Sequence, residues 1–301
     1  MPGAASAANL VEVDDDCLRG WPLPQPDADG DKEERGRVLV IAGSREMPGA
    51  LLLAANAALN AGAGKLTVAT AASVAQLVAT ALPEARVMGL IETAAGGIER
   101  SAVERVRDLL PKVNAVLIGP GMQDEPAVCQ FCAELLNHLS GPALILDAAA
   151  MSVVLERAPM IENFASPAIL TPHAGELAHL TGADKEKIVS QPAAAVIDAA
   201  RRWNAVVALK GATTFIATPD GSLWRHTGGS VGLAISGSGD VLAGVIAGLA
   251  ARGAPVEQAA VWGVALHARA GERLANASGP LGYLARDLSA EVPALMAALA
   301  D

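Results

Sequence analysis

Short apolar runs alternate with longer amphipathic segments along most of the chain. The apolar runs predict strands at 37–42, 65–70, 86–91, 115–118, 143–146, 169–170 and 206–210. Helical spacing of apolar positions predicts helices at 50–61, 74–81, 99–110, 126–139, 193–203, 241–252, 256–274 and 286–299. Buried strands that alternate with amphipathic helices are typical of a mostly parallel sheet with helices on both faces. We therefore predict a three-layer α/β fold.

Two segments depart from this alternation. Pro219-Asp220-Gly221 is a turn signal and predicts a hairpin between strands at 213–218 and 222–226. Residues 1–36 are polar and rich in Asp and Pro, so we expect a lead-in that buries little and lies over the surface. No repeat or linker divides the remainder, and we expect residues 37–301 to form one domain.

Composition narrows the class of protein. The 22 Lys and Arg residues against 32 Asp and Glu give a net charge of −10, which disfavours binding to nucleic acid or to acidic membranes. We expect no membrane span, because Asp240 and several glycines interrupt the apolar stretch 231–251. The first ten residues lack the basic and apolar pattern of a secretory signal, so we expect a cytoplasmic protein.

Cys129 and Cys132 form a C-x-x-C pair inside a predicted helix. No second pair and no nearby His accompanies them, so two ordinary thiols are favoured over a redox or zinc site. We assign no metal-ligating residue from the sequence.

Small or polar residues follow five of the predicted strands. They are Gly43-Ser44, Gly119-Pro120-Gly121, Asp147, Thr171-Pro172-His173 and Lys210-Gly211. Ligands of open α/β sheets bind at the carboxyl ends of strands. Five such ends predict one long shared cleft.

The strongest candidate for chemistry is the segment that precedes the apolar helix at 241–252. Gly237, Ser238 and Gly239 bring free amides to the positive end of a helix dipole, which predicts an anion hole. Asp240 is either the N-cap of that helix or a general base beside a reacting phosphate. A cap does not need three small residues before it, and this favours Asp240 as a catalytic base.

Two look-alike motifs carry no weight. Gly237-x-Gly239 lacks the x-x-Gly continuation of a dinucleotide fingerprint. The segment 62–65 lacks the first Gly of a phosphate loop at Leu59 and its Ser or Thr at Leu66, so we interpret Lys65 as a residue at the edge of a strand.

Six segments together resemble the ADP/ATP-dependent NAD(P)H-hydrate dehydratases of the ribokinase-like superfamily. They are Gly237-Ser238-Gly239-Asp240-Val241-Leu242-Ala243-Gly244, Lys210-Gly211-Ala212-Thr213-Thr214, Thr171-Pro172-His173-Ala174-Gly175-Glu176, the pair Ala42-Gly43-Ser44 and Met47-Pro48-Gly49-Ala50, Ile118-Gly119-Pro120-Gly121, and 282–293. The resemblance covers roughly residues 37–296. Its departures are mild and concern loop geometry: Ala174 stands in place of a usual Pro, and Ile235-Ser236 in place of Lys-Gly or Thr-Ala.

This resemblance implies a reaction. The substrate would be the S-form of a hydrated nicotinamide cofactor, whose ring hydroxyl is phosphorylated so that phosphate can leave and NADH or NADPH is restored. ADP or ATP would be the co-substrate, with Mg²⁺ bridging its phosphates, and a homotetramer is implied. The 36 residues before the first predicted strand are too few for the epimerase domain that some relatives carry, so a separate epimerase is the expected partner.

The resemblance also implies a set of site residues. The hydrate would contact Ala50, Gly121, His173 and Asp240, and the nucleotide would contact Lys210, Gly211, Ala212, Thr213, Thr214 and Gly239. Taken alone, His173 reads more readily as a structural loop histidine. Glu176 could simply cap or orient the following helix, and Asp147 could assist the metal or only close a turn.

Two other functions compete with the dehydratase. One is a kinase of the same superfamily that acts on a vitamin precursor such as a hydroxymethylpyrimidine or a hydroxyethylthiazole. The other is a catalytically silent nucleotide sensor, which the intact Asp240 disfavours because a sensor needs no base. The motifs leave ADP against ATP open, and the epimerase-free resemblance favours ADP.

Overall fold

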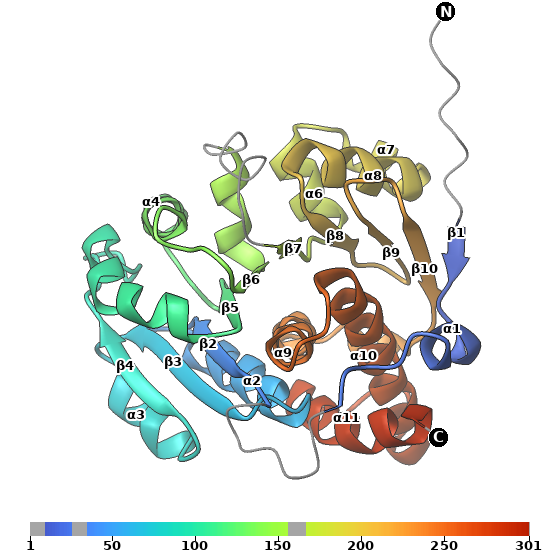
Figure 1. Cartoon of the computed structure of the whole chain (residues 1–301), viewed down its shortest axis with the longest axis horizontal. Coiled ribbons are helices and arrows are strands. Elements are labelled where there is room, and N and C mark those ends of the chain that lie inside the picture. Colours follow the sequence, from blue (N-terminus) through green and yellow to red (C-terminus); the bar gives the residue numbers. More distant parts are fainter. Residues whose placement is uncertain (1–9, 26–34, 156–166, 301) are drawn as a thin grey trace, which may run out of the picture.

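The computed structural model describes residues 10–25, 35–155 and 167–300, and it confirms the predicted three-layer α/β fold (Figure 1). Ten strands form one sheet in the order β1-β10-β9-β8-β7-β6-β5-β2-β3-β4. They are β1 Leu10–Glu12, β2 Arg37–Ile41, β3 Lys65–Ala71, β4 Arg86–Leu90, β5 Ala115–Ile118, β6 Ala143–Leu146, β7 Ala168–Leu170, β8 Val206–Leu209, β9 Thr213–Ala217 and β10 Leu223–Thr227. Of these strands only β9 runs against the others, through the predicted hairpin with β10 and an antiparallel pairing with β8.

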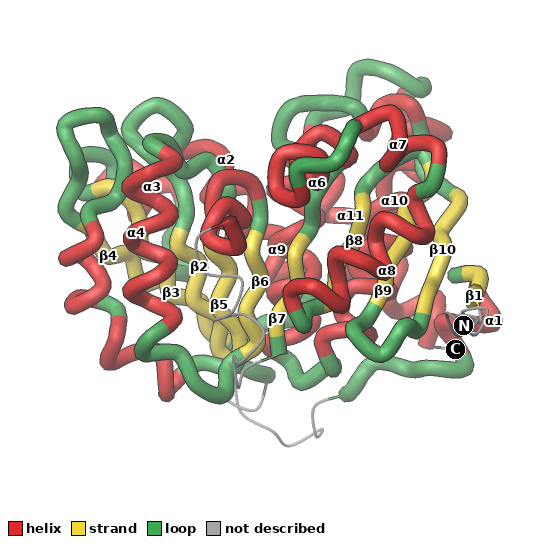
Figure 2. Tube along the Cα trace, turned by 90° about the horizontal axis from the view of Figure 1, so that it is seen from above, coloured by secondary structure: helices red, strands yellow, loops and turns green. Residues whose placement is uncertain are grey.

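Helices cover both faces of this sheet (Figures 1 and 2). They are α1 Asp15–Arg19, α2 Pro48–Asn60, α3 Ala75–Ala81, α4 Glu125–Leu136, α6 Ala174–Thr181, α7 Lys185–Ser190, α8 Pro192–Trp203, α9 Ser238–Ala251, α10 Val256–Ser278 and α11 Ala285–Ala300, with 3₁₀ helices η1 Arg100–Arg105, η2 Arg107–Lys112, η3 Ala148–Ser152 and η4 Val231–Leu233. No helix within the described ranges has both the length and the apolar character needed to cross a membrane.

Strand β2 is apolar at each of its four buried positions, 38–41, because helices cover both of its faces. Val38 and Val40 join a core formed with α2, α9, α10 and α11, whereas Leu39 and Ile41 join a core formed with α4, α6 and α8 on the other face. Successive side chains of a strand point to opposite faces, so a strand covered on both faces must be apolar throughout.

The order of the strands places a switch point between β2 and β5. The chain passes from β2 outward to β3 and β4, and then returns to the other side of β2 as β5. Connections leave these two neighbouring strands in opposite directions, which is where open α/β sheets bind ligands. The strand ends meet there: the amide of Gly43, after β2, donates to the carbonyl of Pro120, after β5, at 2.7 Å.

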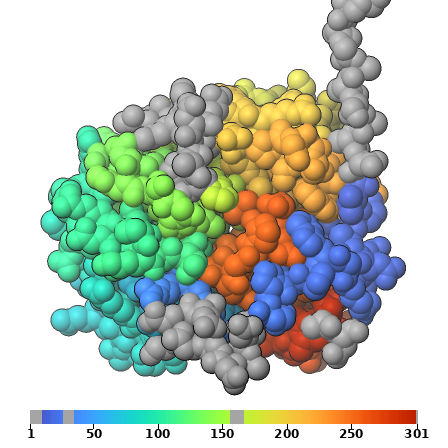
Figure 3. Space-filling model, in the orientation of Figure 1, coloured from blue at the N-terminus to red at the C-terminus, as the bar shows by residue number. Residues whose placement is uncertain are grey.

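Most side chains of residues 10–25 are exposed, as expected of the N-terminal lead-in, but the segment also joins the sheet and the core. Strand β1 extends the sheet beside β10, and Leu18 of α1 is fully buried. The acidic run has a local role, because the Asp14 side chain caps α1 by accepting from the amide of Cys17. In the space-filling view this blue segment lies against the orange and red C-terminal helices (Figure 3). Residues 1–9 and 26–34 of the lead-in lie outside the described residues.

The helix predicted at 99–110 is instead the two 3₁₀ helices η1 and η2. Pro111 lies inside η2 and has no amide hydrogen to donate, which disfavours an α-helix in η2 but does not reach η1. The other predicted helices and strands are present, with ends that differ by a few residues.

Candidate active site

The predicted anion hole lies at the start of α9, and no side chain caps this helix. Gly237 is the N-cap, in the left-handed conformation with φ of 89°. This backbone conformation favours glycine, and a Cβ there would also displace the Leu53 side chain, whose Cδ1 would lie 2.4 Å away. The Ser238 amide donates to the Ile235 carbonyl at 3.3 Å, and no acceptor among the described residues bonds the amides of Gly239 and Asp240. These two donors are therefore left for an anion, whereas the prediction of a free Ser238 amide is wrong.

Helix α9 is fixed by a close approach to α2. A Cβ on Gly244 would lie 2.2 Å from the Ala54 carbonyl oxygen, and one on Gly248 would lie 2.4 Å from the carbonyl oxygen of Ala58. Only glycine allows the two backbones to come so near. The first turn of α9 is consequently held at a fixed place beside the helix that begins with Pro48.

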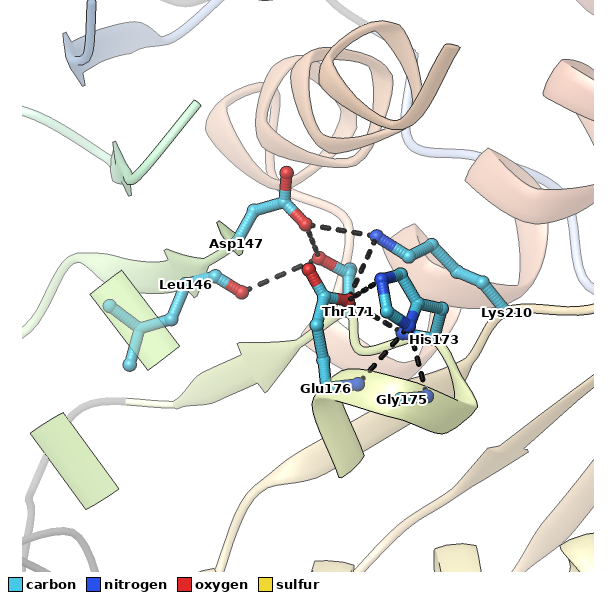
Figure 4. Close-up of polar contacts among 7 residues, drawn as sticks. All are labelled: Leu146, Asp147, Thr171, His173, Gly175, Glu176 and Lys210. Atoms are coloured by element: carbon cyan, nitrogen blue, oxygen red, sulfur yellow. Dashed lines mark hydrogen bonds and ion pairs between the residues drawn. The ribbon is translucent and has the colours of Figure 1, made fainter. Parts of the chain in front are cut away.

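A polar cluster joins the ends of β6, β7 and β8 (Figure 4). Asp147 Oδ1 accepts from Thr171 Oγ1 at 2.7 Å and from Lys210 Nζ at 3.2 Å. Lys210 Nζ also lies 3.8 Å from Glu176 Oε2. Burial opposes the charge on Lys210, but the attraction of Asp147, Glu176 and Asp240 outweighs it and raises the lysine pKa, so Lys210 is a cation at neutral pH.

This cluster reaches the start of α9 through Lys210. The lysine Nζ lies 3.5 Å from the point that a Cβ on Gly239 would occupy. A half-buried cation, a helix N-terminus and two unbonded amides therefore meet at one place, and each of them attracts a phosphate. The predicted pairing of Lys210 with Gly239 has its geometric basis here.

Asp240 is the third residue of α9, and its carboxylate does not cap the helix. The N-cap alternative is therefore wrong. Burial raises the pKa of Asp240 to about 7, repulsion from Asp147 adds to the rise, and the positive charge of Lys210 opposes it. A general base works best when its pKa lies near the operating pH. Asp240 has that property without any ligand present.

His173 and Glu176 form a capping box at the start of α6. His173 Nδ1 accepts from the amides of Gly175 and Glu176 at 3.0 and 3.1 Å, while Glu176 Oε2 accepts from the His173 amide at 2.7 Å. The interpretation of Glu176 as a capping residue is confirmed. His173 also has a structural role, and its ring remains 59% exposed. Contact with the hydrate stays a prediction for this residue.

The remaining predicted residues form two neighbouring groups. Ala50 and Gly121 adjoin at the switch point: Gly121 has φ of 65°, and a Cβ there would lie 2.6 Å from Ala50 Cβ. Gly211 and Ala212 make the turn between β8 and β9, which Thr213 and Thr214 begin. The loop before Gly121 approaches the polar cluster, because a Cβ on Gly119 would lie 1.8 Å from the Asp147 carbonyl oxygen.

One residue of this region escaped the sequence prediction. His267 of α10 has its Nε2 2.9 Å from Ser238 Oγ, in the first turn of α9. In the sequence it stands inside a predicted helix, with no glycine or motif beside it. Its only signal is one histidine on a helix face that is otherwise apolar, formed by Gly263, Val264, Ala270 and Gly271.

The cysteines of α4 are ordinary buried thiols, as predicted. Cys129 and Cys132 are both buried and neither forms a disulfide, and burial raises the pKa of Cys132. A thiol that resists ionisation is a poor nucleophile and a poor metal ligand. Among residues 10–25, 35–155 and 167–300 no group of three His, Cys, Asp or Glu side chains is placed to hold a metal ion.

The raised pKa of Asp240 predicts a stability effect with a definite sign. Between the usual Asp pKa of about 3.9 and the folded value, the native state holds a proton that the unfolded chain has lost, so stability falls as pH rises. The Asp240→Asn side chain cannot ionise, so at pH 8 this variant should have a free energy of unfolding about 1–3 kcal/mol higher than the parent. This range is reduced because the Asp240 side chain is partly exposed. The difference should vanish near pH 4.

Asp184 serves as the matched control for this measurement. It caps α7, and hydrogen bonds from Glu186 and Lys187 lower its pKa, so the sign reverses. Asp184→Asn should not be stabilised at pH 8. A denaturation series in which Asp240→Asn is less stable than the parent at pH 8 and equal to it at pH 4 would contradict the assigned burial of the Asp240 charge.

Comparison with known proteins gives a consistent result. The family model described as NAD(P)H-hydrate dehydratase matches residues 38–294. The ADP-dependent (S)-NAD(P)H-hydrate dehydratase of Xanthomonas campestris pv. campestris is 48% identical over 281 residues, which are 93% of this chain and 94% of that one. A Bacillus subtilis ADP/ATP-dependent NAD(P)H-hydrate dehydratase, co-crystallised with ATP and Mg²⁺, superposes with a TM-score of 0.83 at 31% identity, over 97% of this chain and 100% of the other.

Other relatives are longer than this chain. The bifunctional NAD(P)H-hydrate repair enzyme of Moorella thermoacetica is 40% identical over 266 residues, which are 88% of this chain and 50% of that enzyme. The chain thus spans nearly the full length of the dehydratases and about half the length of the bifunctional relatives.

Proposed function

The chain belongs to the NAD(P)H-hydrate dehydratase family, and on that premise we propose that it uses ADP, or ATP, to dehydrate the S-form of NAD(P)H hydrate. The products would be NADH or NADPH, phosphate, and AMP or ADP. Such an enzyme is a hydro-lyase that repairs damaged nicotinamide nucleotides.

One arrangement supports this reaction above the rest. The Asp240 carboxylate lies in the first turn of α9, next to the free amide of Gly239. Lys210 lies near the Gly239 backbone and near the Asp240 carboxylate. Hydroxide is a poor leaving group, so the hydrate must first be converted to a phosphate ester. That step needs a base for the hydroxyl and a cradle for the phosphoryl group in contact with each other.

The residues then divide the work between them. Asp240 accepts the proton of the ring hydroxyl, whose oxygen attacks the terminal phosphorus of the nucleotide, and the bond from that phosphorus to the departing AMP or ADP breaks. The amides of Gly239 and Asp240 and the ammonium of Lys210 stabilise the charge on the phosphoryl oxygens. The ring nitrogen lone pair next expels phosphate, and loss of a proton from the adjacent ring carbon restores the dihydronicotinamide.

The donor set is compatible with Mg²⁺. This ion is usually held by one or two carboxylates together with substrate phosphates and water, so no cluster of three protein ligands is required. Asp147 and Asp240 repel each other strongly enough to raise the Asp240 pKa, and the two contacts of Asp147 in Figure 4 both use Oδ1. Asp147 Oδ2 would hold the ion, which would supply charge neutralisation to the nucleotide phosphates and leave the Asp240 carboxylate free to accept the proton.

Further parts of the proposal rest on the family resemblance. Gly211, Ala212, Thr213 and Thr214 follow Lys210 directly and would continue the nucleotide site, while Ala50, Gly121 and His173 would contact the hydrate. Ala50 and Gly121 stand at the switch point of the sheet, which suits this role. A homotetramer, a cytoplasmic location and a separate epimerase acting on the same hydrate complete the proposal.

The test is to incubate the protein with a mixture of the two epimers of hydrated NADH, Mg²⁺, and either ADP or ATP. Absorbance in the reduced-nicotinamide band should reappear only when nucleotide is present, and it should stop rising when the S-form is consumed. Adding an epimerase should restart it. The rates with equal concentrations of the two nucleotides give the preference, for which we expect ADP.

A vitamin-precursor kinase of the same superfamily would share the anion hole and the base. It would release a stable phosphate ester of a hydroxymethylpyrimidine or hydroxyethylthiazole and restore no absorbance. Detection of that ester by mass spectrometry, together with unchanged hydrate, would overturn the dehydratase proposal. Formation of neither product would favour a nucleotide sensor.

A further inference from the structure

The first turn of α9 lacks a side-chain cap. A Ser, Thr, Asp or Asn at the N-cap normally bonds the amides of the first turn and so fixes its geometry. Here the N-cap is Gly237, which has no side chain to do this, and the amides of Gly239 and Asp240 bond nothing in the described chain. The donors that face a phosphate must be held in position by a group outside the helix.

The Ser238 side chain provides such an attachment. Ser238 is 4% exposed, and its Oγ lies 2.9 Å from His267 Nε2 on α10. Ser238 is the residue directly before Gly239, so its attachment fixes the peptide that carries one of the two free donors. The bond therefore fixes the start of α9 from the side and leaves its amides open.

His267 is suited to this role because its ring is neutral. Burial lowers the pKa of His267 to about 4. A hydrogen bond to the Ser238 backbone opposes this fall, and the nearby charge of Lys210 adds to it. A neutral imidazole has one N–H and one lone pair, and either can bond the Ser238 hydroxyl. The ring thus orients Ser238 at neutral pH without adding a second cation beside Lys210.

We propose that His267 is a positioning residue for phosphoryl transfer, which acts through Ser238 to hold the amides of Gly239 and Asp240 in line with the transferring group. His267 touches neither nucleotide nor hydrate in this role. The inference rests on the proposed function, because it needs a phosphoryl group at the start of α9. Misplacing a catalytic group by about 1 Å can cost about 10²-fold in rate, so a small shift of this turn is enough to matter.

The test compares two substitutions of His267 that carry the same side-chain amide group but differ in length by one methylene. In His267→Gln the side-chain amide reaches the position of Nε2 and can bond Ser238, whereas in His267→Asn it is one methylene too short. We expect kcat of the Asn variant to fall by about 10–100-fold, and the Gln variant to stay within about 5-fold of the parent. The KM of the hydrate should change by less than about 3-fold in both, because the binding of the ring is not affected.

Trp262 offers the matched control on the same helix. It is buried, and its Nε1 donates to the Trp21 carbonyl at 2.8 Å, away from the start of α9. Trp262→Phe also removes one buried hydrogen bond of α10, so it should lower thermal stability and leave kcat within about 3-fold. A merely structural His267 would give the same pattern as Trp262.

A double-variant cycle completes the experiment. If His267 acts through Ser238, Ser238→Ala and His267→Asn should not be additive, and the double variant should be about as slow as the slower single one. Equal kcat for the Asn, Gln and parent proteins, or fully additive losses, would overturn the proposal. A parent protein that restores no NADH would instead refute the proposed function, and ADP affinity measured by calorimetry would still report the effect of each His267 variant on the anion hole.

Discussion

Asp240→Asn should lower the rate of hydrate dehydration by about 10²–10⁴-fold and leave the protein folded. The amide keeps the size of the carboxylate, but it cannot accept a proton from the ring hydroxyl. Because Asp240 does not cap α9, its replacement removes no bond that holds the helix. The measurement is the initial rate of NADH recovery at saturating ADP, with circular dichroism to show that the fold is retained.

The pH dependence gives a second view of the same residue. A base must be ionised to act, so kcat/KM of the parent should rise with pH through an apparent pKa near the value of about 7 that Asp240 has in the free protein. The Asp240→Asn variant should lose this rise. Its residual rate should depend little on pH, because the amides of the anion hole and the charge of Lys210 do not titrate in that range.

The activity control is again Asp184→Asn, which exchanges the same groups at the exposed start of α7 and should leave the rate unchanged. An Asp240→Asn protein that is folded and converts the hydrate within about tenfold of the parent would refute the base assignment, given the usual contribution of a general base. Together with the expected gain in stability at pH 8, a large loss of rate would show that this site trades stability for function.

The layered fold could be predicted from sequence because its strands are covered on both faces. The runs at 115–118 and 143–146 are apolar at every position and match β5 and β6. The prediction was wrong where local chemistry competes with periodicity. Residues 99–110 have helical spacing, yet they form two 3₁₀ helices, and Pro111 bears only on the second of them.

The part of the N-terminal segment that joins the sheet and the core was missed for a different reason. Residues 10–25 look polar because their charges cap and flank the short helix α1, while a few apolar side chains do the burying. Some of the contacts that hold the segment use the backbone carbonyls of Trp21 and Pro22, which accept from Gln258 and Trp262 of α10. Carbonyl groups are the same in every residue, so composition contains no sign of these contacts.

The site was predictable to the extent that its residues follow strands. Asp147, Thr171 and Lys210 each stand at or directly after the end of a strand, and parallel neighbours bring those ends together. His267 was not predictable in this way, because it follows no strand. It lies inside a mostly apolar helix and contacts the site only through Ser238. The pairing of His267 with Ser238 depends on how α10 packs against α9, which a single sequence does not specify.

Gly239→Val should abolish nucleotide binding without disturbing the fold. Gly239 is the second residue of α9, and a Cβ there would meet only Lys210 Nζ, at 3.5 Å. The isopropyl group would therefore occupy the space in which a phosphate approaches the amides. Hydrogen bonds to a charged group contribute about 1.5–3 kcal/mol each, and the loss of two would weaken ADP binding by about 100-fold or more. Calorimetry with ADP and Mg²⁺ measures this directly.

Gly49→Val is the control that the chain itself offers. Gly49 is also the second residue of a helix, α2, and a Cβ there has no neighbour within 4 Å. The two variants thus make the same change at equivalent helical positions with open space, and only Gly239 belongs to the predicted nucleotide site. ADP affinity should be unchanged in Gly49→Val. If Gly239→Val binds ADP as tightly as the parent, the start of α9 is not the phosphate site, and the roles proposed for Lys210 and Asp240 fall with it.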